Sequence, residues 1–117
     1  FWLARQALFE ANLEAPEKIA RQDKQIDQLY RQIEQDCVAL IALQSPVAQD
    51  LRLLSALMQL VRDLERIGDY AEDLGEIAVR LFPYEPSVYM VQIKPMCDRC
   101  RAMLAMSLAA LSDLDAE

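Results

Sequence analysis

Apolar residues recur at every third or fourth position over long segments of this sequence, and proline separates the segments. Pro16, Pro46 and the pair Pro83 and Pro86 divide the chain into four such segments. This spacing places apolar side chains along one face of an α-helix. Only two of the 117 residues are glycine, which is too few for the turns of a many-stranded sheet. We therefore predict an all-α fold.

The prolines also set the predicted helix boundaries. A single domain over 1–117 should hold the end of a leading helix and then three long helices, at 1–14, 16–44, 46–82 and 87–114. Pro16 suits a first helical position, Ser45 should cap the next helix, and Pro95 should kink the last helix or delay its start. Long helices with short connections bury their apolar faces only against neighbours alongside, which predicts an antiparallel bundle.

Charge and composition exclude several classes of protein. Lys and Arg total 12 against 19 Asp and Glu, so the net charge is −7, whereas a nucleic-acid binder needs an excess of positive charge. No apolar run approaches the roughly 20 residues of a membrane span, so we expect no membrane insertion. Three cysteines, Cys37, Cys97 and Cys100, favour a reducing compartment, the cytoplasm. Since Phe1 is not Met and no signal-peptide pattern follows it, we expect a fragment of a longer product.

Acidic residues lie where the apolar face of the third segment should continue. Glu65 and Asp69 fall within about 40° of the apolar stripe of that helix, at 100° per residue. Asp23 and Asp27 lie at the edge of the stripe of the preceding helix. Because the start of one antiparallel helix lies beside the end of the other, the four carboxylates could approach one another.

Clustered carboxylates repel one another, and a bound cation would compensate this repulsion. The chain has no histidine, so the ligands would all be oxygen atoms, which favours magnesium, manganese or iron over a structural zinc site. The alternative is a solvated acidic border in which Arg62 pairs with Glu65 and Arg66 with Asp69. Spacing alone does not decide between the two.

Other acids and the two glycines lie on the same helix. We interpret Glu72, Asp73 and Glu76 as supporting or plain surface acids. Gly68 and Gly75 lie within about 20° of each other on the helix, where each costs about 1 kcal/mol against alanine. A close approach of helices, or access of a cation to the acids, would explain them.

Three motifs resemble the PhoU family of phosphate-uptake regulators. Residues 46–52 read PVAQDLR at the head of a helix, residues 63–69 read DLERIGD some four turns on, and residues 23–27 of the preceding helix read DKQID. The resemblance covers 17–74 firmly and the remainder loosely. It implies a repeat of three long helices, usually present twice per chain, so this chain holds about one repeat.

The resemblance also implies a function and a site. Asp23, Asp27, Glu65 and Asp69 match the family's metal motifs, so we expect divalent or trivalent metal ions, iron first, with zinc, manganese or magnesium as alternatives. Family members act as cytoplasmic adaptors that repress the phosphate-starvation response by contacting the phosphate-specific ABC transporter and its sensor histidine kinase. With one repeat, apolar faces stay unpartnered, and we expect a homodimer. The alternative function is a plain helical dimerisation or interaction module without a metal role.

Catalysis finds little support in the sequence. No histidine, Gly-x-Ser-x-Gly turn or glycine-rich phosphate loop occurs, and a ferritin-like di-iron site would need Glu-x-x-His pairs. We therefore expect no enzyme activity. Cys97 and Cys100 form a lone CxxC that could be a redox pair or half of a zinc site, but packed helical thiols are the simpler interpretation.

Overall fold

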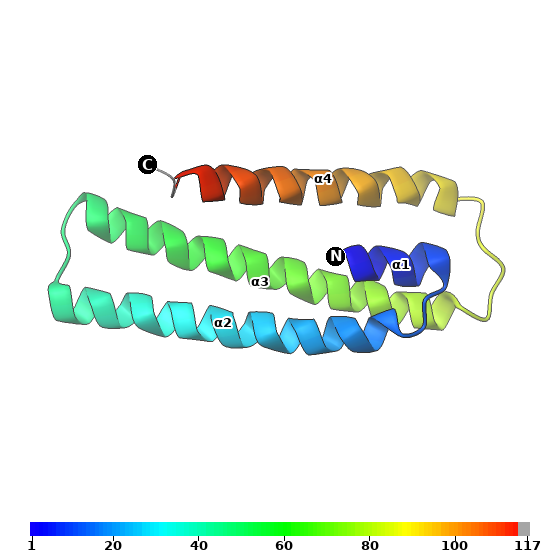
Figure 1. The fold of residues 1–117 in the computed structure, drawn as a ribbon, viewed down its shortest axis with the longest axis horizontal. Coiled ribbons are helices and arrows are strands. Elements are labelled where there is room, and N and C mark those ends of the chain that lie inside the picture. The colour runs from blue at the N-terminus through cyan, green and yellow to red at the C-terminus, as the bar shows by residue number, and fades with distance from the viewer. Residues whose placement is uncertain (115–117) are drawn as a thin grey trace.

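The computed structural model describes residues 1–114 and consists of four α-helices and their connections (Figure 1). The all-α prediction is confirmed. The last three residues of the predicted domain lie outside the described residues. The helices are α1 (Trp2–Glu10), α2 (Ala15–Gln44), α3 (Gln49–Leu81) and α4 (Met90–Leu114).

The predicted starts of the third and fourth helices are wrong, and the proline at position 46 explains why Ser45 does not cap the third helix. Ser45 does not cap the third helix; it ends α2 in the left-handed conformation, with φ 45° and its N–H bonded to the carbonyl of Ile41. A residue before proline avoids the right-handed helical region, so Ser45 leaves the helix and α3 begins only at Gln49, after Ala48 at φ 53°. The last helix begins at Met90 rather than at residue 87, and Pro95 lies inside it. Pro16 occupies the first turn of α2 as predicted.

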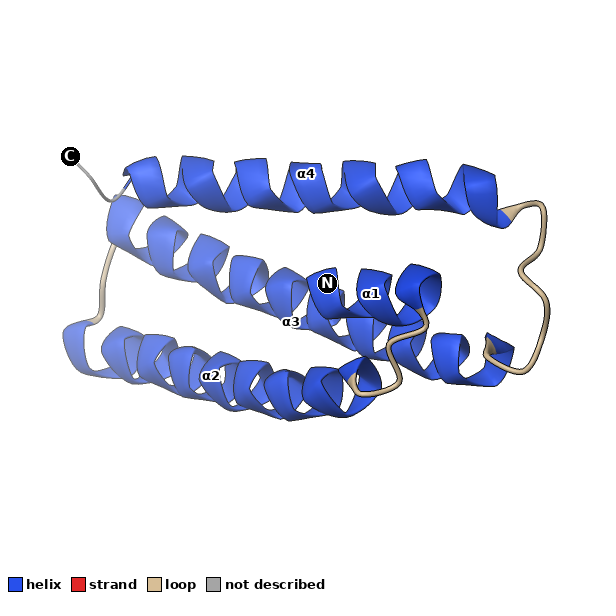
Figure 2. Cartoon of the chain, turned by 45° about the vertical axis from the view of Figure 1, so that its right-hand side comes forward, coloured by secondary structure: helices blue, strands red, loops and turns tan. Residues whose placement is uncertain are grey.

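Helices α2 and α3 form a long antiparallel hairpin, and α1 packs on both of them at the end where α2 begins (Figure 2). The buried positions where the three helices meet are mostly small, which lets the helix backbones approach closely. They are Ala4, Ala7, Ala15, Ile19, Ala71 and Ala78. The interior of this bundle is therefore thin, and Ile19 is its largest buried side chain at the junction.

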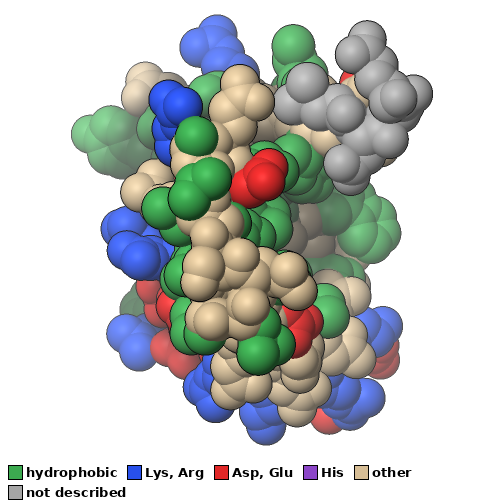
Figure 3. All heavy atoms as spheres, turned by 90° about the vertical axis from the view of Figure 1, so that its left-hand side faces the viewer, with side chains coloured by type: hydrophobic (Ala, Val, Ile, Leu, Met, Phe, Trp, Pro, Cys, Tyr) green, Lys and Arg blue, Asp and Glu red, His purple; other side chains and the backbone are tan. Residues whose placement is uncertain are grey.

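Helix α4 lies along the other side of α1 and is joined to it by an ion pair, with Arg5 Nε 2.6 Å from Asp98 Oδ1. An apolar groove of about 330 Å³ runs between α2, α3 and α4 beyond Phe1, with Ile33, Leu64 and Leu104 among its walls. Many large apolar side chains are exposed on the distal half of the hairpin, including Leu43, Val47 and Leu53. Figure 3 views the end of the molecule that holds the α2–α3 connection, where exposed hydrophobic side chains lie among backbone, polar and charged atoms.

Among the helices of residues 1–114, none combines the length and the apolarity that a membrane span requires.

Candidate metal centre

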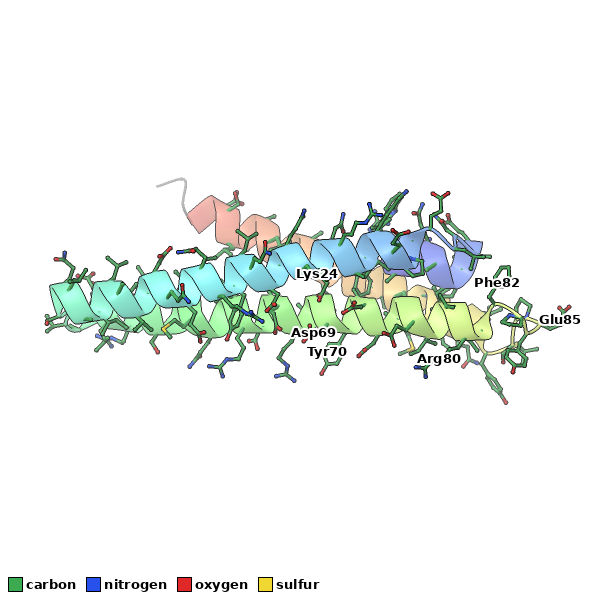
Figure 4. The ribbon with its side chains drawn as sticks, turned by 90° about the horizontal axis from the view of Figure 1, so that it is seen from below. Lys24, Asp69, Tyr70, Arg80, Phe82 and Glu85 are labelled. Atoms are coloured by element: carbon green, nitrogen blue, oxygen red, sulfur yellow. The ribbon has the colours of Figure 1, made fainter. Side chains whose placement is uncertain are left out.

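The four predicted site residues come from two neighbouring helices. Asp23 and Asp27 lie one turn apart on α2, and Glu65 and Asp69 lie one turn apart on α3. Asp23, Asp27 and Glu65 are half-buried, and Asp69 is exposed. Figure 4 shows Asp69 on α3 at the same level along the bundle as Lys24 of α2, next to Asp23 in the sequence. The antiparallel hairpin therefore brings both acidic pairs to one level, as the sequence predicts.

The electrostatics of these carboxyl groups also indicate that they lie together. Burial raises the pKa of Asp23 above its ordinary value, and the charges of Asp69 and Asp27 raise it further. The pKa of Glu65 is raised first by burial and then by Asp69, Asp27 and Asp23 in that order. Carboxylates on α2 thus repel carboxylates on α3, and the folded protein holds them in mutual repulsion.

Glu72 is a member of this cluster that the sequence analysis left outside the site. It lies one turn beyond Asp69, and its pKa is raised by burial, then by the charge of Asp23 and by a hydrogen bond shared with Asp23. The same hydrogen bond lowers the pKa of Asp23, against the effects of burial and of Asp69. The signal was present in the sequence, because Glu72 lies seven residues after Glu65 and therefore on the same face of α3.

Basic side chains compensate only part of this charge. Arg31 Nη2 lies 2.8 Å from Asp27 Oδ2, one turn along α2. Arg66 instead donates a 3.4 Å hydrogen bond to the Tyr70 hydroxyl, and among the side chains that the structure describes neither Arg62 nor Arg66 pairs with Glu65 or Asp69. Among the described side chains, Glu65 and Asp69 therefore lack the two ion pairs that the solvated-border alternative assigns to them. Farther along, Glu76 and Arg80 form the ordinary surface pair, 3.7 Å apart.

The type of donor fits a hard cation, although the side chains are not gathered around one point. All the polar atoms that the cluster presents are carboxylate oxygens, the ligands that magnesium, manganese and iron accept. Within residues 1–114, no group of three or more His, Cys, Asp or Glu side chains lies in a geometry that could hold a metal ion as it stands. Cation binding would therefore require these exposed and half-buried side chains to rotate towards one another.

The cysteines lie outside this cluster and are free thiols. Cys37 and Cys97 are buried and Cys100 is exposed. Burial raises the pKa of the Cys97 thiol, and the neighbouring Cys100 and Asp98 raise it further. A reactive thiol needs a lowered pKa, so Cys97 is suited to packing rather than to redox chemistry.

Comparisons with known proteins agree with the motif resemblance. The family model of the PhoU domain matches residues 1–78. A protein of Synechocystis named phosphate-specific transport system accessory protein PhoU homolog is 59% identical over 115 residues, which are 98% of this chain and 51% of the relative. Proteins of the same name from Aquifex aeolicus and Pseudomonas putida are 36% and 35% identical, over 96% and 95% of this chain and 51% and 44% of their own length. The chain thus spans about half the length of these curated relatives. No solved structure matches it.

Proposed function

The chain belongs to the PhoU family, and from this premise we propose that it is part of a cytoplasmic regulatory adaptor of phosphate uptake that binds metal ions. Its matched relatives are named as accessory proteins of the phosphate-specific transport system. The role that we propose is regulation by contact, in which the adaptor represses phosphate-starvation signalling by touching the phosphate ABC transporter and its sensor histidine kinase. It is not the role of an enzyme.

The observation that carries the metal part of this proposal is the acidic cluster between α2 and α3, whose charge is only partly compensated by Arg31. Asp23, Asp27, Glu65 and Asp69 would hold divalent or trivalent ions, with iron the first candidate and zinc, manganese or magnesium the alternatives. A bound cation would supply positive charge where the folded chain sets carboxylates against each other. Metal binding would in this way tie α2 to α3 and stabilise the surface of the hairpin.

The contact part of the proposal is supported by the amount of exposed apolar surface. Soluble monomers rarely expose large contiguous apolar patches, and such patches are typical of interaction sites. The distal half of the hairpin and α4 expose Leu43, Val47, Leu53 and Met103 to more than half of their full area. We propose that a second copy of the chain covers part of this surface in a homodimer, and that partners of the transport system bind the remainder.

Metal analysis and a paired set of variants test the proposal. Purified protein should retain stoichiometric iron, or bind Mn²⁺ in titration calorimetry, and Glu65→Gln with Asp69→Asn should abolish that binding. The control removes the same number of charges at exposed positions at the start of α2, with Glu14→Gln at the N-cap and Glu17→Gln in the first turn, and should bind as the original chain does. In cells, the full gene product carrying the Glu65 and Asp69 substitutions should fail to repress a phosphate-starvation reporter in phosphate-rich medium.

The alternative function is a helical dimerisation or interaction module without a metal role, which the exposed apolar surface favours by itself. It predicts a concentration-dependent dimer in light scattering with no bound metal under any loading condition. If the protein is a monomer and binds metal, the proposed homodimer is wrong and the proposed metal binding is supported.

A further inference from the structure

A pocket of about 300 Å³ lies at the end of the bundle where α1 and α3 end and α4 begins. This volume is at the lower end of the range of about 300–1,000 Å³ that is typical of ligand sites. Three aromatic residues line the pocket: Phe9 of α1, Phe82 directly after α3, and Tyr84 in the connection to α4. Figure 4 shows Phe82 and Glu85, which also lines the pocket, together at this end of the molecule.

The backbone around this pocket favours positive charge. The C-terminal turns of α1 and α3 both form part of its walls. Free carbonyl groups at the C-terminus of a helix carry a partial negative charge, which a basic residue in the last turn compensates. The last turn of α1 has no basic residue, and Arg80 in the last turn of α3 lies 3.7 Å from Glu76 in an ion pair. Among the described residues, no Lys or Arg side chain lines the pocket.

One carboxylate and the aromatic rings favour a cation as well. Glu85 lines the pocket and forms no ion pair with the side chains that the structure describes. The faces of aromatic rings attract cations, more often the guanidinium group of arginine. The chain itself contains one such contact, because the guanidinium group of Arg5 lies 5.9 Å from the centroid of the Phe9 ring. Helix ends, carboxylate and rings thus all favour a positively charged ligand.

The connection between α3 and α4, residues 82–89, holds one wall of the pocket in place. A turn closes at its start, where the Tyr84 N–H donates a 2.9 Å hydrogen bond to the Leu81 carbonyl. Pro83 and Pro86 have fixed φ angles, which restricts the connection further. A ligand therefore meets a pocket that is already formed, so that binding costs little ordering of the chain.

The surface beside the pocket indicates that the cation belongs to a protein rather than to a free small molecule. Val88, Tyr89 and Val91 are neighbours in sequence of residues that line the pocket, and they are 80%, 68% and 77% exposed. A small cation would leave this apolar surface in water. A protein segment would cover it while one of its side chains enters the pocket.

We propose that this pocket binds an arginine side chain of a partner protein. The guanidinium group lies against the rings of Phe82 and Tyr84 and beside Glu85, and the methylene groups of the arginine contact the apolar walls. This inference rests on the proposed regulation by contact, for which it gives the chemistry of one contact residue of the partner.

The experiment is a titration of the ¹⁵N-labelled chain with an apolar, otherwise uncharged peptide that carries one arginine, followed by NMR amide shifts. The control peptide carries citrulline, which has nearly the shape of arginine without its charge. We expect saturable shifts of Phe9, Phe82 and Tyr84 with the arginine peptide and none with the citrulline peptide. Equal shifts with both peptides, or no shifts with either, would overturn the inference. Free butylguanidinium should bind more weakly than the arginine peptide, and an equal affinity would overturn the assignment to a protein partner.

Two exposed residues of the pocket supply variants that keep the fold, which circular dichroism checks. Tyr84→Leu removes a ring and Glu85→Gln removes the charge, and each should weaken binding of the arginine peptide about 2- to 5-fold. Tyr70→Leu and Asp36→Asn make the same kinds of change at exposed positions outside the pocket and should leave the affinity unchanged. If the two pocket variants bind the peptide as tightly as the original chain does, the inference is wrong.

A reporter assay distinguishes this inference from the proposed function. In the full gene product, Tyr84→Leu with Glu85→Gln should reduce repression of the phosphate-starvation reporter in phosphate-rich medium. If the original product represses and this variant represses equally well, the pocket is not the contact; this inference is overturned and the proposed function stands. If the original product does not repress the reporter, the proposed function is overturned, and with it the role of the pocket in regulation, whatever the peptide titration shows.

Discussion

Truncation of Ile19 to alanine should destabilise the protein by about 3 kcal/mol. Ile19 is 5% exposed and packs against Ala4 of α1 and Ala71 of α3, where the other buried residues are alanines. The change removes the equivalent of three methylene groups, each worth about 0.8 kcal/mol when buried, which gives roughly 2.4 kcal/mol. The cavity adds to this cost, and measured isoleucine-to-alanine changes in cores span about 2–5 kcal/mol. In a domain of about 5–15 kcal/mol total stability, this is a large fraction.

Urea unfolding followed by circular dichroism measures this effect, at a fixed protein concentration because self-association would add stability. Val88→Ala is the control: Val88 lies in the connection between α3 and α4 and is 80% exposed, and truncation there should change the free energy of unfolding by less than about 0.5 kcal/mol. Equal effects of the two substitutions would refute the packing of α1, α2 and α3 around Ile19.

Three further predictions follow from the charged groups. Burial and neighbouring carboxylates raise the pKa values of Asp23, Glu65 and Glu72, so at these groups the folded metal-free protein binds protons more tightly than the unfolded chain does. The free energy of unfolding should therefore rise as the pH falls from 7 through these raised pKa values towards the ordinary 3.8 and 4.5. A fall over this pH range in urea titrations would contradict the repulsion between these carboxylates. Asp23→Asn should stabilise the metal-free protein at pH 7 and have a smaller effect near pH 4, where the carboxyl group is already protonated; equal effects at both pH values would contradict repulsion as the cause. Asp98→Ala removes the ion pair to Arg5, so amide hydrogen exchange in α4 should become faster while exchange in α2 and α3 stays unchanged.

The sequence predicts the class and the arrangement of the helices because these depend on periodic patterns. The spacing of apolar residues defines α2 and α3, and their antiparallel packing follows from the short connection between them. Once both helices are placed, the angular positions of Asp23 and Glu65 bring the acids together. The juxtaposition of the two acidic pairs was therefore predictable.

The parts that sequence analysis missed depend on local geometry between neighbours. Ser45 has the composition of a helix cap, yet the restriction that Pro46 imposes on it places it at the end of α2 instead. The sequence places Glu72 on the same face of α3 as Glu65, but its hydrogen bond with Asp23 depends on the packing of α2 against α3 and on the rotamers of both side chains. The pairing of Arg66 with Tyr70 rather than with Asp69 is a choice of rotamer that helical spacing does not determine.

We propose that carboxylates from α2 and α3 share a cation, and an anomalous difference map from crystals grown with Mn²⁺ reveals whether they do. We expect a peak between the two helices with oxygens of at least one of Asp23 and Asp27, and at least one of Glu65 and Asp69, at coordination distances of about 2.0–2.6 Å. A fully loaded crystal with no peak there, or with manganese held by one helix alone, would contradict it.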